Sequence, residues 1–278
     1  MICYPNVKIN LGLHVLRRRP DGFHDLETLF VPYPEISDCL EVIPADDYSR
    51  TLAGLKERYG TLTQAISPDG KLMITLARKE GVDWDPLKDL TAKAYALLAA
   101  DYALPPMKIF LEKRSPVGAG LGGGSADAAF ALRAMAELAG LALPDATLAA
   151  YAARLGSDCA FFVYNRPMFG SGRGEVLEPF AMDLSKYMLE VVVPEGIAVS
   201  TAEAYRGITP RVPEKALRDV LQQDISTWRT DLKNDFEHTV FAVHPALARV
   251  KAALYERGAL YAAMSGSGSA CFGIFPKD

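Results

Sequence analysis

Residues 113–129 read KRSPVGAGLGGGSADAA, and this stretch decides which fold the sequence encodes. Five of the seven residues from 118 to 124 are glycine, which leaves little side-chain bulk in the loop. The preceding residues, 107–113, are typical of a strand, and residues 125–139 are typical of a helix. A glycine loop that leads into a helix lets backbone N–H groups and the helix N-terminus converge on an anion. We therefore expect a phosphate-binding loop and a helix that opens at Ser125, rather than a flexible connector.

Two common phosphate loops do not fit this stretch. A Walker A loop needs Lys followed by Ser or Thr after its last glycine, and here Ser125 directly follows Gly124. A G-x-G-x-x-G match begins at Gly118, but a dinucleotide fold also needs a second strand that ends in an acid about 20 residues later. Residues 125–155 instead favour two helices separated by Pro144. A nicotinamide-dependent oxidoreductase is therefore disfavoured.

The segments around the loop predict a mixture of strands and helices. Residues 7–15 alternate apolar and polar side chains, which predicts a strand with one buried face. Lys8, Asn10 and His14 then share the other face, where the plainer interpretation is a solvated surface. Residues 45–70 are polar and irregular, and we expect a surface excursion there. A second strand is expected after the Pro-Asp-Gly turn of residues 17–30. Further strands are expected at 38–43, 71–77, 107–113, 187–193, 259–264 and 270–275, and helices at 90–103, 125–139, 145–155, 213–223, 233–242 and 245–257. This order favours an α+β protein.

Composition narrows the function classes. The chain has 278 residues, of which 50% are hydrophobic, and a net charge of −4. The apolar fraction excludes a disordered protein, and the mild acidity argues against a nucleic-acid polymer as partner. No apolar run is long enough to predict a membrane span. The four cysteines (Cys3, Cys39, Cys159, Cys271) are scattered, so we expect reduced thiols and a cytoplasmic protein; the oligomeric state is left open.

Four motifs, in order, resemble those of the GHMP kinases (galactokinase, homoserine, mevalonate and phosphomevalonate kinases). The loop at 116–125 has the pattern P-x-x-x-G-L-G-G-G-S of that family's phosphate loop. PNVKINLGL at 5–13, GSDCAFF at 156–162 and MSGSGSACFGIF at 264–275 are similar to its other three motifs. The resemblance implies a two-domain α+β GHMP kinase-like fold, with domains at 1–165 and 166–278 and the active site in the cleft between them. The SGSGS segment at 265–269 is expected either to bring backbone donors close to the substrate phosphates or to brace the first glycine loop, and it can form a tight turn between strands at the same time.

The resemblance also implies a reaction, in which the γ-phosphoryl group of ATP moves to a hydroxyl of a small molecule. Lys8 and Asp158 match the family's catalytic lysine and acid, although Asp158 alone could be an ordinary loop carboxylate. Mg²⁺ should accompany ATP; no carboxylate ligand is assigned to it, and Ser125 is a candidate ligand through the ATP-bound metal. The expected ATP-binding residues are Pro116, Val117, Gly118, Ala119, Gly120, Leu121, Gly122, Gly123, Gly124, Ser125 and Ala126.

A narrower resemblance rests on R-x-D-G-F-H at 19–24 together with K-I-N-L at 8–11. It indicates the branch of the family that phosphorylates the 2-hydroxyl of 4-diphosphocytidyl-2-C-methyl-D-erythritol in non-mevalonate isoprenoid precursor biosynthesis. Substrate contacts are then expected from Asn10, Phe23, His24 and Tyr205, with Phe23 where this branch usually has Tyr. Phe23 could instead be a hydrophobic plug beneath its turn. The alternatives are a mevalonate- or homoserine-type GHMP kinase and a non-catalytic nucleotide-binding protein on the same fold.

Overall fold

The computed structural model describes residues 1–277, which pack into two compact units. The first unit contains residues 1–7, 33–117 and 122–165, and the second contains residues 8–32, 118–121 and, of the described residues, all those from 166 onward. The chain passes from the first unit to the second after residue 165, and the division into domains at 1–165 and 166–278 stays a prediction. A single division after residue 165 would place residues 8–32 and 118–121 in the first unit, whereas both segments pack with the second unit.

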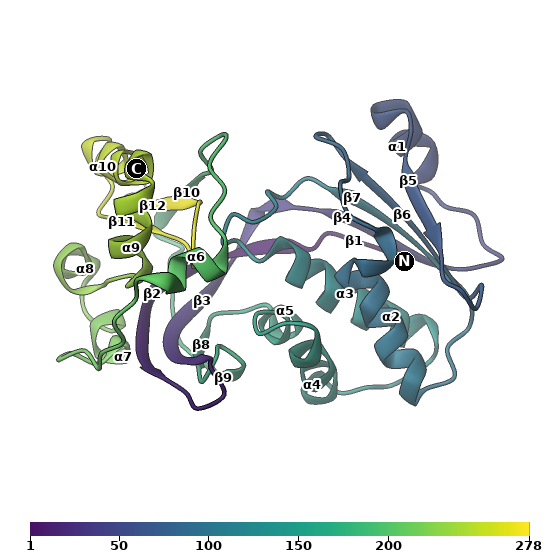
Figure 1. Ribbon diagram of the computed structural model, residues 1–278, viewed down its shortest axis with the longest axis horizontal. Helices are drawn as coiled ribbons and strands as arrows, with labels where there is room; N and C mark the ends of the chain where they lie inside the picture. The colour runs from purple at the N-terminus through teal and green to yellow at the C-terminus, as the bar shows by residue number, and fades with distance from the viewer. Residues whose placement is uncertain (278) are drawn as a thin grey trace. The chain divides into compact units, whose positions relative to one another are not determined.

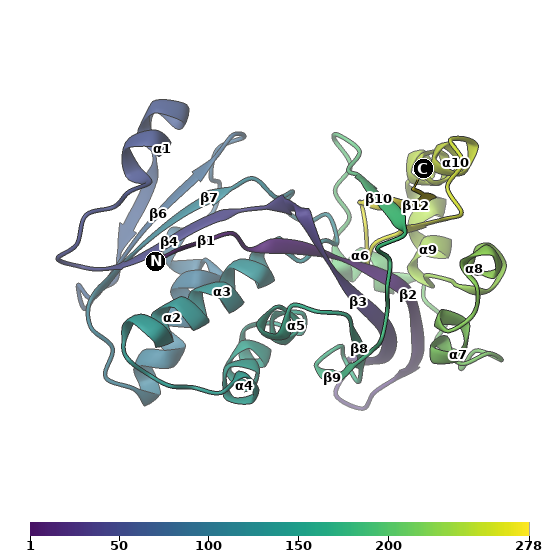
Figure 2. The ribbon, with the colours of Figure 1, turned by 180° about the vertical axis from the view of Figure 1, so that it is seen from behind.

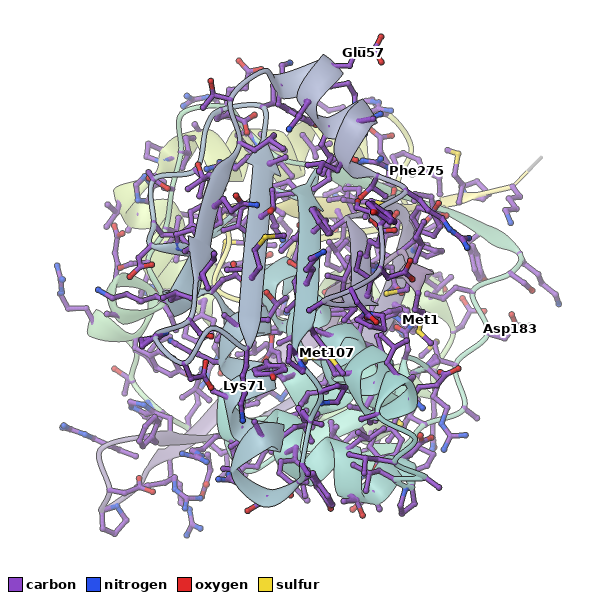
Figure 3. The ribbon with its side chains drawn as sticks, turned by 90° about the vertical axis from the view of Figure 1, so that its right-hand side faces the viewer. Met1, Glu57, Lys71, Met107, Asp183 and Phe275 are labelled. Carbon is purple, nitrogen blue, oxygen red and sulfur yellow. The ribbon has the colours of Figure 1, made fainter. Side chains whose placement is uncertain are left out.

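The first unit is built on a five-stranded sheet in which only one pair of neighbouring strands is parallel. Its helices α2 to α5 lie on one side of this sheet and α1 lies on the other (Figures 1 and 2). Figure 3 shows the side with α1, which carries Glu57, while Met107 begins the central strand β7. The sheet order is β1 (Ile2–Cys3), β4 (Cys39–Pro44), β7 (Met107–Lys113), β6 (Leu72–Arg78), β5 (Thr63–Ile66), and the helices are α1 (Leu52–Tyr59), α2 (Leu90–Asp101), α3 (Gly123–Leu138), α4 (Asp145–Leu155) and α5 (Cys159–Tyr164), with a 3₁₀ turn at Pro86–Lys88.

The second unit contains two antiparallel sheets. One is formed by the long strands β2 and β3 and by the hairpin β8–β9 (Figure 2), and residues 8–32 of the two long strands and their turn belong to this unit. The other has three strands and packs against α10. The bounds are β2 (Asn6–Arg18), β3 (His24–Ser37), β8 (Met168–Ser171), β9 (Val176–Pro179), β10 (Tyr187–Val192), β11 (Tyr261–Met264), β12 (Cys271–Pro276), α6 (Thr201–Arg206), α7 (Leu217–Leu221), α8 (Ile225–Asp231), α9 (Phe236–Val243) and α10 (Pro245–Glu256).

The α+β class and most of the expected strands are confirmed, but three local predictions were wrong. Residues 45–70 are not irregular throughout, because α1 buries Leu55 against Phe110 and β5 pairs with β6. Residues 6–15 of β2 are buried on both faces, so His14 is 5% exposed rather than solvated. The expected helix at 213–223 is reduced to the five residues of α7, and α5, α6 and α8 were not predicted.

Two further expectations from the sequence concern reduced cysteine thiols and the absence of a membrane span. All four cysteines fall within the described residues and none of them forms a disulfide, as expected. Among residues 1–277, no helix combines the length and the apolar character that crossing a bilayer requires.

Candidate active site

Lys8 is held in the second unit by two oxygen acceptors. Its ammonium group donates to the Asn10 side-chain oxygen at 2.6 Å and to the Gly120 carbonyl at 3.0 Å. Asn10 is oriented in turn by Thr28, whose hydroxyl accepts from the Asn10 amide at 3.0 Å. Lys8 is only 2% exposed, so the solvated-strand interpretation is excluded. The predicted pairing of Lys8 with Asn10 on one strand face is confirmed by this contact.

The first half of the glycine loop, residues 118–121, packs within the second unit. Gly118 and Gly120 have positive φ, whereas Ala119 and Leu121 do not. Alternation of this kind turns successive N–H groups toward one concave side, where an anion can bind. A side chain at Gly120 would place its Cβ 2.2 Å from the Ser265 carbonyl oxygen, so only glycine fits.

The C-terminal SGSGS segment braces this half of the loop. The Ser265 hydroxyl donates to the Gly120 carbonyl at 3.0 Å, and the Ala270 N–H donates to the Ala119 carbonyl at 3.0 Å. The bracing role expected for residues 265–269 is therefore confirmed. Lys8 and Ser265 bind the same Gly120 carbonyl oxygen, which ties the lysine, the loop and the brace together.

Asn234 is a structural residue of this arrangement; Asn234-Asp235-Phe236 resembles a segment of the GHMP kinases, but the sequence assigns it no role. Its side-chain amide donates to the carbonyls of Met264 and Gly266, both at 2.8 Å, while its oxygen accepts from the N–H of Phe236 at 3.0 Å. One buried side chain thus links the start of α9 to the brace. The available signal was an Asn two residues before a helix, a position where Asn often bonds nearby backbone.

The second half of the loop belongs to the first unit and leads into α3. This helix begins at Gly123, two residues earlier than expected, and Gly122 precedes it with φ +73°. Ser125 therefore lies inside the first helical turn rather than at its cap. The N–H groups of that turn have no partners within the helix and point toward its N-terminal end. They can bind a phosphate oxygen, assisted by the positive end of the helix dipole.

Asp158 occupies the position before α5, close to the first turn of α3. The Ser125 hydroxyl makes a hydrogen bond with the sulfur of Cys159, which partly offsets the burial that raises the pKa of that thiol to about 12. Asp158 itself is half-buried and caps no helix N–H group with its side chain. The first unit thus brings the candidate hydroxyl ligand and the candidate acid to neighbouring positions.

A buried polar cluster lies directly behind the loop in the first unit. Lys113 donates from its ammonium group to Asp38 at 2.5 Å, to Asp127 at 2.7 Å and to the Ser115 hydroxyl at 3.0 Å. Asp38 also accepts from the N–H of Arg114 at 2.6 Å and of Ser115 at 2.7 Å. A Cβ at Gly123 would lie 2.2 Å from the Ser115 hydroxyl oxygen. The cluster therefore fastens residues before the loop to residues after it, and the sequence analysis missed it.

The two carboxyl groups of this cluster differ in protonation. Burial raises the pKa of Asp127 well above its usual range, since Lys113 only partly opposes it. The pKa of Asp38 is lowered, because Lys113 and the Ser115 hydrogen bonds outweigh its burial. Among the described residues, one oxygen of Asp127 has no hydrogen-bond partner. One lysine can balance one carboxylate, and the second carboxyl is favoured in its neutral form.

The predicted base-binding residues gather at the turn between β2 and β3. The His24 and Tyr205 rings stack with centroids 4.7 Å apart and planes 20° apart. Tyr205 comes from α6, and its other neighbour is Phe236, 4.7 Å away edge-to-face. Phe23 is 54% exposed, so it is not a hydrophobic plug beneath the turn. Phe23 precedes His24 in the chain, and its exposed ring provides a flat aromatic surface of the kind that binds a nucleobase.

Comparisons with known proteins agree with the motifs. Residues 89–166 match the family described as GHMP kinases N terminal domain, and residues 215–278 match GHMP kinases C terminal. The 4-diphosphocytidyl-2-C-methyl-D-erythritol kinase of Parabacteroides distasonis is 44% identical over 277 residues, which cover 100% of this chain and 92% of that protein. The chain belongs to the GHMP kinase family. It is therefore a small-molecule phosphotransferase of the family that takes its phosphoryl group from ATP.

Other relatives and solved structures extend this result. The 4-diphosphocytidyl-2-C-methyl-D-erythritol kinase of Nitratidesulfovibrio vulgaris is 37% identical, and the match covers 97% of this chain and 88% of that protein. A crystal structure of 4-(cytidine 5'-diphospho)-2C-methyl-D-erythritol kinase is 32% identical, with a TM-score of 0.72 over 99% of this chain and 90% of that one. Homoserine kinase from Cytophaga hutchinsonii has a TM-score of 0.67 at 16% identity, covering 98% and 85% of the two chains, and shares the fold alone.

Proposed function

We propose that this GHMP kinase transfers the γ-phosphoryl group of ATP to the 2-hydroxyl of 4-diphosphocytidyl-2-C-methyl-D-erythritol, in the cytoplasm. The observation that carries the proposal is the 44% identity, over the whole chain, to a relative of that name. The exposed ring of Phe23 and the stacked rings of His24 and Tyr205 support it, because mevalonate and homoserine have no base to stack. The reaction places the enzyme in non-mevalonate isoprenoid precursor synthesis.

Lys8 and Asp158 are the proposed catalytic residues. Phosphoryl transfer requires a positioned hydroxyl, a partner for its proton and stabilisation of the charge that develops. Asp158 would orient the 2-hydroxyl and accept its proton, and its side chain is half-buried rather than fully enclosed. Lys8 would stabilise negative charge on the reacting oxygens. Its bonds to Asn10 and Gly120 hold the ammonium group in place before substrate binds.

The proposed ATP site is the glycine loop, Pro116 to Ala126, with phosphate oxygens bound by backbone N–H groups. The bracing by Ser265 and the first turn of α3 are the features that support this assignment. Mg²⁺ would accompany ATP, because one lysine neutralises little of the charge of a triphosphate. The Ser125 hydroxyl would be its protein ligand, and the ion would neutralise charge on the phosphates.

Substrate comparison tests the proposed function. Purified protein with ATP and Mg²⁺ should release ADP with 4-diphosphocytidyl-2-C-methyl-D-erythritol in a coupled assay. Mevalonate and homoserine should give no more ADP than a reaction without acceptor. ADP release with either of these two acceptors, and none with the cytidine compound, would assign the enzyme to another branch of the family.

His24→Ala is expected to raise the KM for the cytidine substrate about 5–50-fold, since the change removes both a stacking ring and a hydrogen-bonding group. The KM for ATP should change less than twofold. His238, an exposed histidine on α9, provides the matched control, and His238→Ala should behave as wild type. Steady-state kinetics with each substrate varied in turn measures both constants. A rise confined to the ATP constant would contradict the placement of His24.

A further inference from the structure

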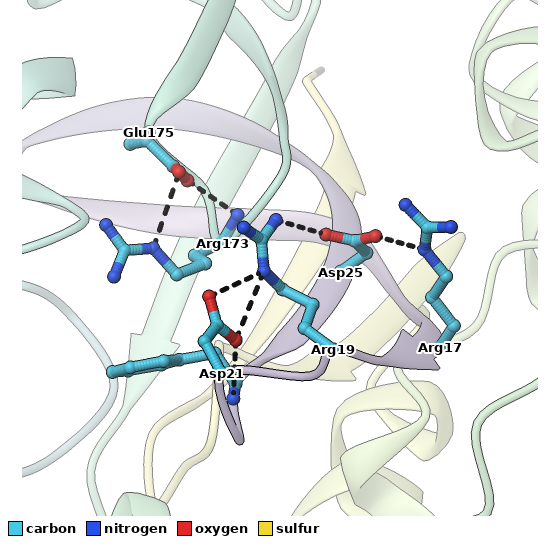
Figure 4. A network of polar contacts seen from close by, with 7 residues as sticks. Arg17, Arg19, Asp21, Asp25, Arg173 and Glu175 are labelled. Atoms are coloured by element: carbon cyan, nitrogen blue, oxygen red, sulfur yellow. Dashed lines mark hydrogen bonds and ion pairs between the residues drawn. The ribbon is translucent and has the colours of Figure 1, made fainter.

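The turn that carries Phe23 is fixed by charged side chains on both strands. Arg19 donates to Asp21 at 3.1 Å and to Asp25 at 2.8 Å, and Arg17 also binds Asp25 (Figure 4). The N–H of Phe23 donates to Asp21 at 3.1 Å. The backbone of Phe23 is therefore anchored within the turn, whereas its ring remains 54% exposed.

A second turn, between β8 and β9, brings Arg173 to this ring. The Arg173 guanidinium carbon lies 4.9 Å from the centre of the Phe23 ring, which is within the range of a cation–π contact. Arg173 is oriented from its own turn by Glu175, which accepts from the Arg173 backbone N–H at 2.5 Å and from its Nε at 3.4 Å. In Figure 4, Arg173 and Glu175 face the turn that carries Asp21. The guanidinium thus covers one face of an aromatic ring that has no hydroxyl to anchor it.

We propose that Arg173 is a specificity-determining residue for the base of the nucleotide substrate, because it fixes the Phe23 ring and leaves the opposite face for the pyrimidine. The inference rests on the proposed function. A freely rotating exposed ring loses conformational entropy when a base stacks on it. A ring that is already held by a cation loses less, and binding is tighter without any contact between Arg173 and the reacting atoms.

The contact with Arg173 also explains how Phe23 can stack on a base without the phenolic hydroxyl of the usual Tyr. Arg173 sits on the face of the ring, so its contribution depends on the π system and not on a hydrogen bond from the side chain. Asp21 and Glu175 are the nearby acids, and each is already engaged by an arginine of the two turns. The same carboxylates limit the attraction of Arg173 for the substrate diphosphate, which favours the aromatic role over direct phosphate binding.

Arg173→Ala tests this inference through the KM for the cytidine substrate, which should rise about 3–10-fold. Its kcat and its KM for ATP should stay within about twofold of wild type, and Arg173→Lys should restore most of the loss by keeping the cation. Arg229 makes a similar contact, 4.3 Å from the Tyr255 ring, between α8 and α10. Arg229→Ala is therefore the matched control and should leave both KM values unchanged.

A double-mutant cycle separates ring positioning from other roles. In a Phe23→Ala background, Arg173→Ala should cause no further rise in KM. A further rise of the same size would overturn the inference, as would an unchanged KM in the single variant. A lowered KM would also overturn it, because the guanidinium would then occupy the place of the base. A wild-type enzyme without activity on the cytidine substrate would instead overturn the proposed function, and the inference with it.

Discussion

Asp158→Ala is expected to lower kcat with the cytidine substrate by about 10²–10⁴-fold, which corresponds to about 3–5 kcal/mol of transition-state stabilisation. The reason is that the 2-hydroxyl would lose the carboxylate that orients it and accepts its proton. ATP affinity should change little, because the ATP site proposed here is the glycine loop. Asp158→Asn should be impaired to a similar degree, since an amide keeps the shape of the side chain but cannot take up the proton.

Rapid-quench measurement of a single turnover isolates the chemical step in these variants. Asp46, an exposed carboxylate in the segment after β4, supplies the control, and Asp46→Ala should retain wild-type kcat. Thermal unfolding of each variant checks that the fold is intact. An Asp158→Ala enzyme with the turnover of wild type would remove Asp158 from the catalytic assignment.

The second large effect concerns stability, and it comes from the buried cluster behind the glycine loop. Asp38→Asn should lower the free energy of unfolding by about 3–5 kcal/mol, because it removes the ionised partner of the buried Lys113 ammonium. Asp127→Asn should not lower it at neutral pH, because an amide resembles the neutral carboxyl group in size and charge and has no proton to keep at that pH. Urea denaturation of both variants provides the comparison. Equal destabilisation by the two changes would contradict the assigned protonation states.

The pH dependence of the same two variants has opposite signs. The pKa of Asp127 is raised in the folded state, so its contribution to stability is complete below about pH 4 and declines as the pH rises toward the folded value. Asp127→Asn should therefore gain stability relative to wild type as the pH rises. The pKa of Asp38 is lowered, so its contribution is present above about pH 4 and is lost as the pH falls through the folded value. The defect of Asp38→Asn should shrink in acid.

Short-range patterns were sufficient to predict the elements that frame the site. Alternation over residues 7–15 identified β2, and the glycine-dense loop before an alanine-rich segment identified α3. The helix α1 was missed because Leu55 is its only buried residue, which leaves almost no apolar periodicity to detect. The burial of His14 was missed because alternation implied one exposed face, whereas both faces of β2 are covered over residues 6–15.

The contacts that organise the site could not be predicted from local patterns. Asp38 and Lys113 are 75 residues apart in the sequence, and Asn10 and Ser265 are 255 residues apart, yet each pair meets in the fold. Motifs placed Lys8, the loop and the serine-glycine segment in order, but only tertiary packing shows that Lys8 and Ser265 share the Gly120 carbonyl. Asn234 likewise gains its role only once β11 and α9 are side by side.

The position of the new phosphate in the product tests the central claim most directly. The 2-hydroxyl of the methylerythritol group lies on a carbon that bears a methyl group and no hydrogen. Proton-coupled ³¹P NMR of the product made from ATP and 4-diphosphocytidyl-2-C-methyl-D-erythritol should therefore show a new phosphomonoester signal without three-bond splitting by protons. A doublet or triplet would place the phosphate on another hydroxyl, and the absence of any new phosphomonoester signal would contradict the proposed reaction.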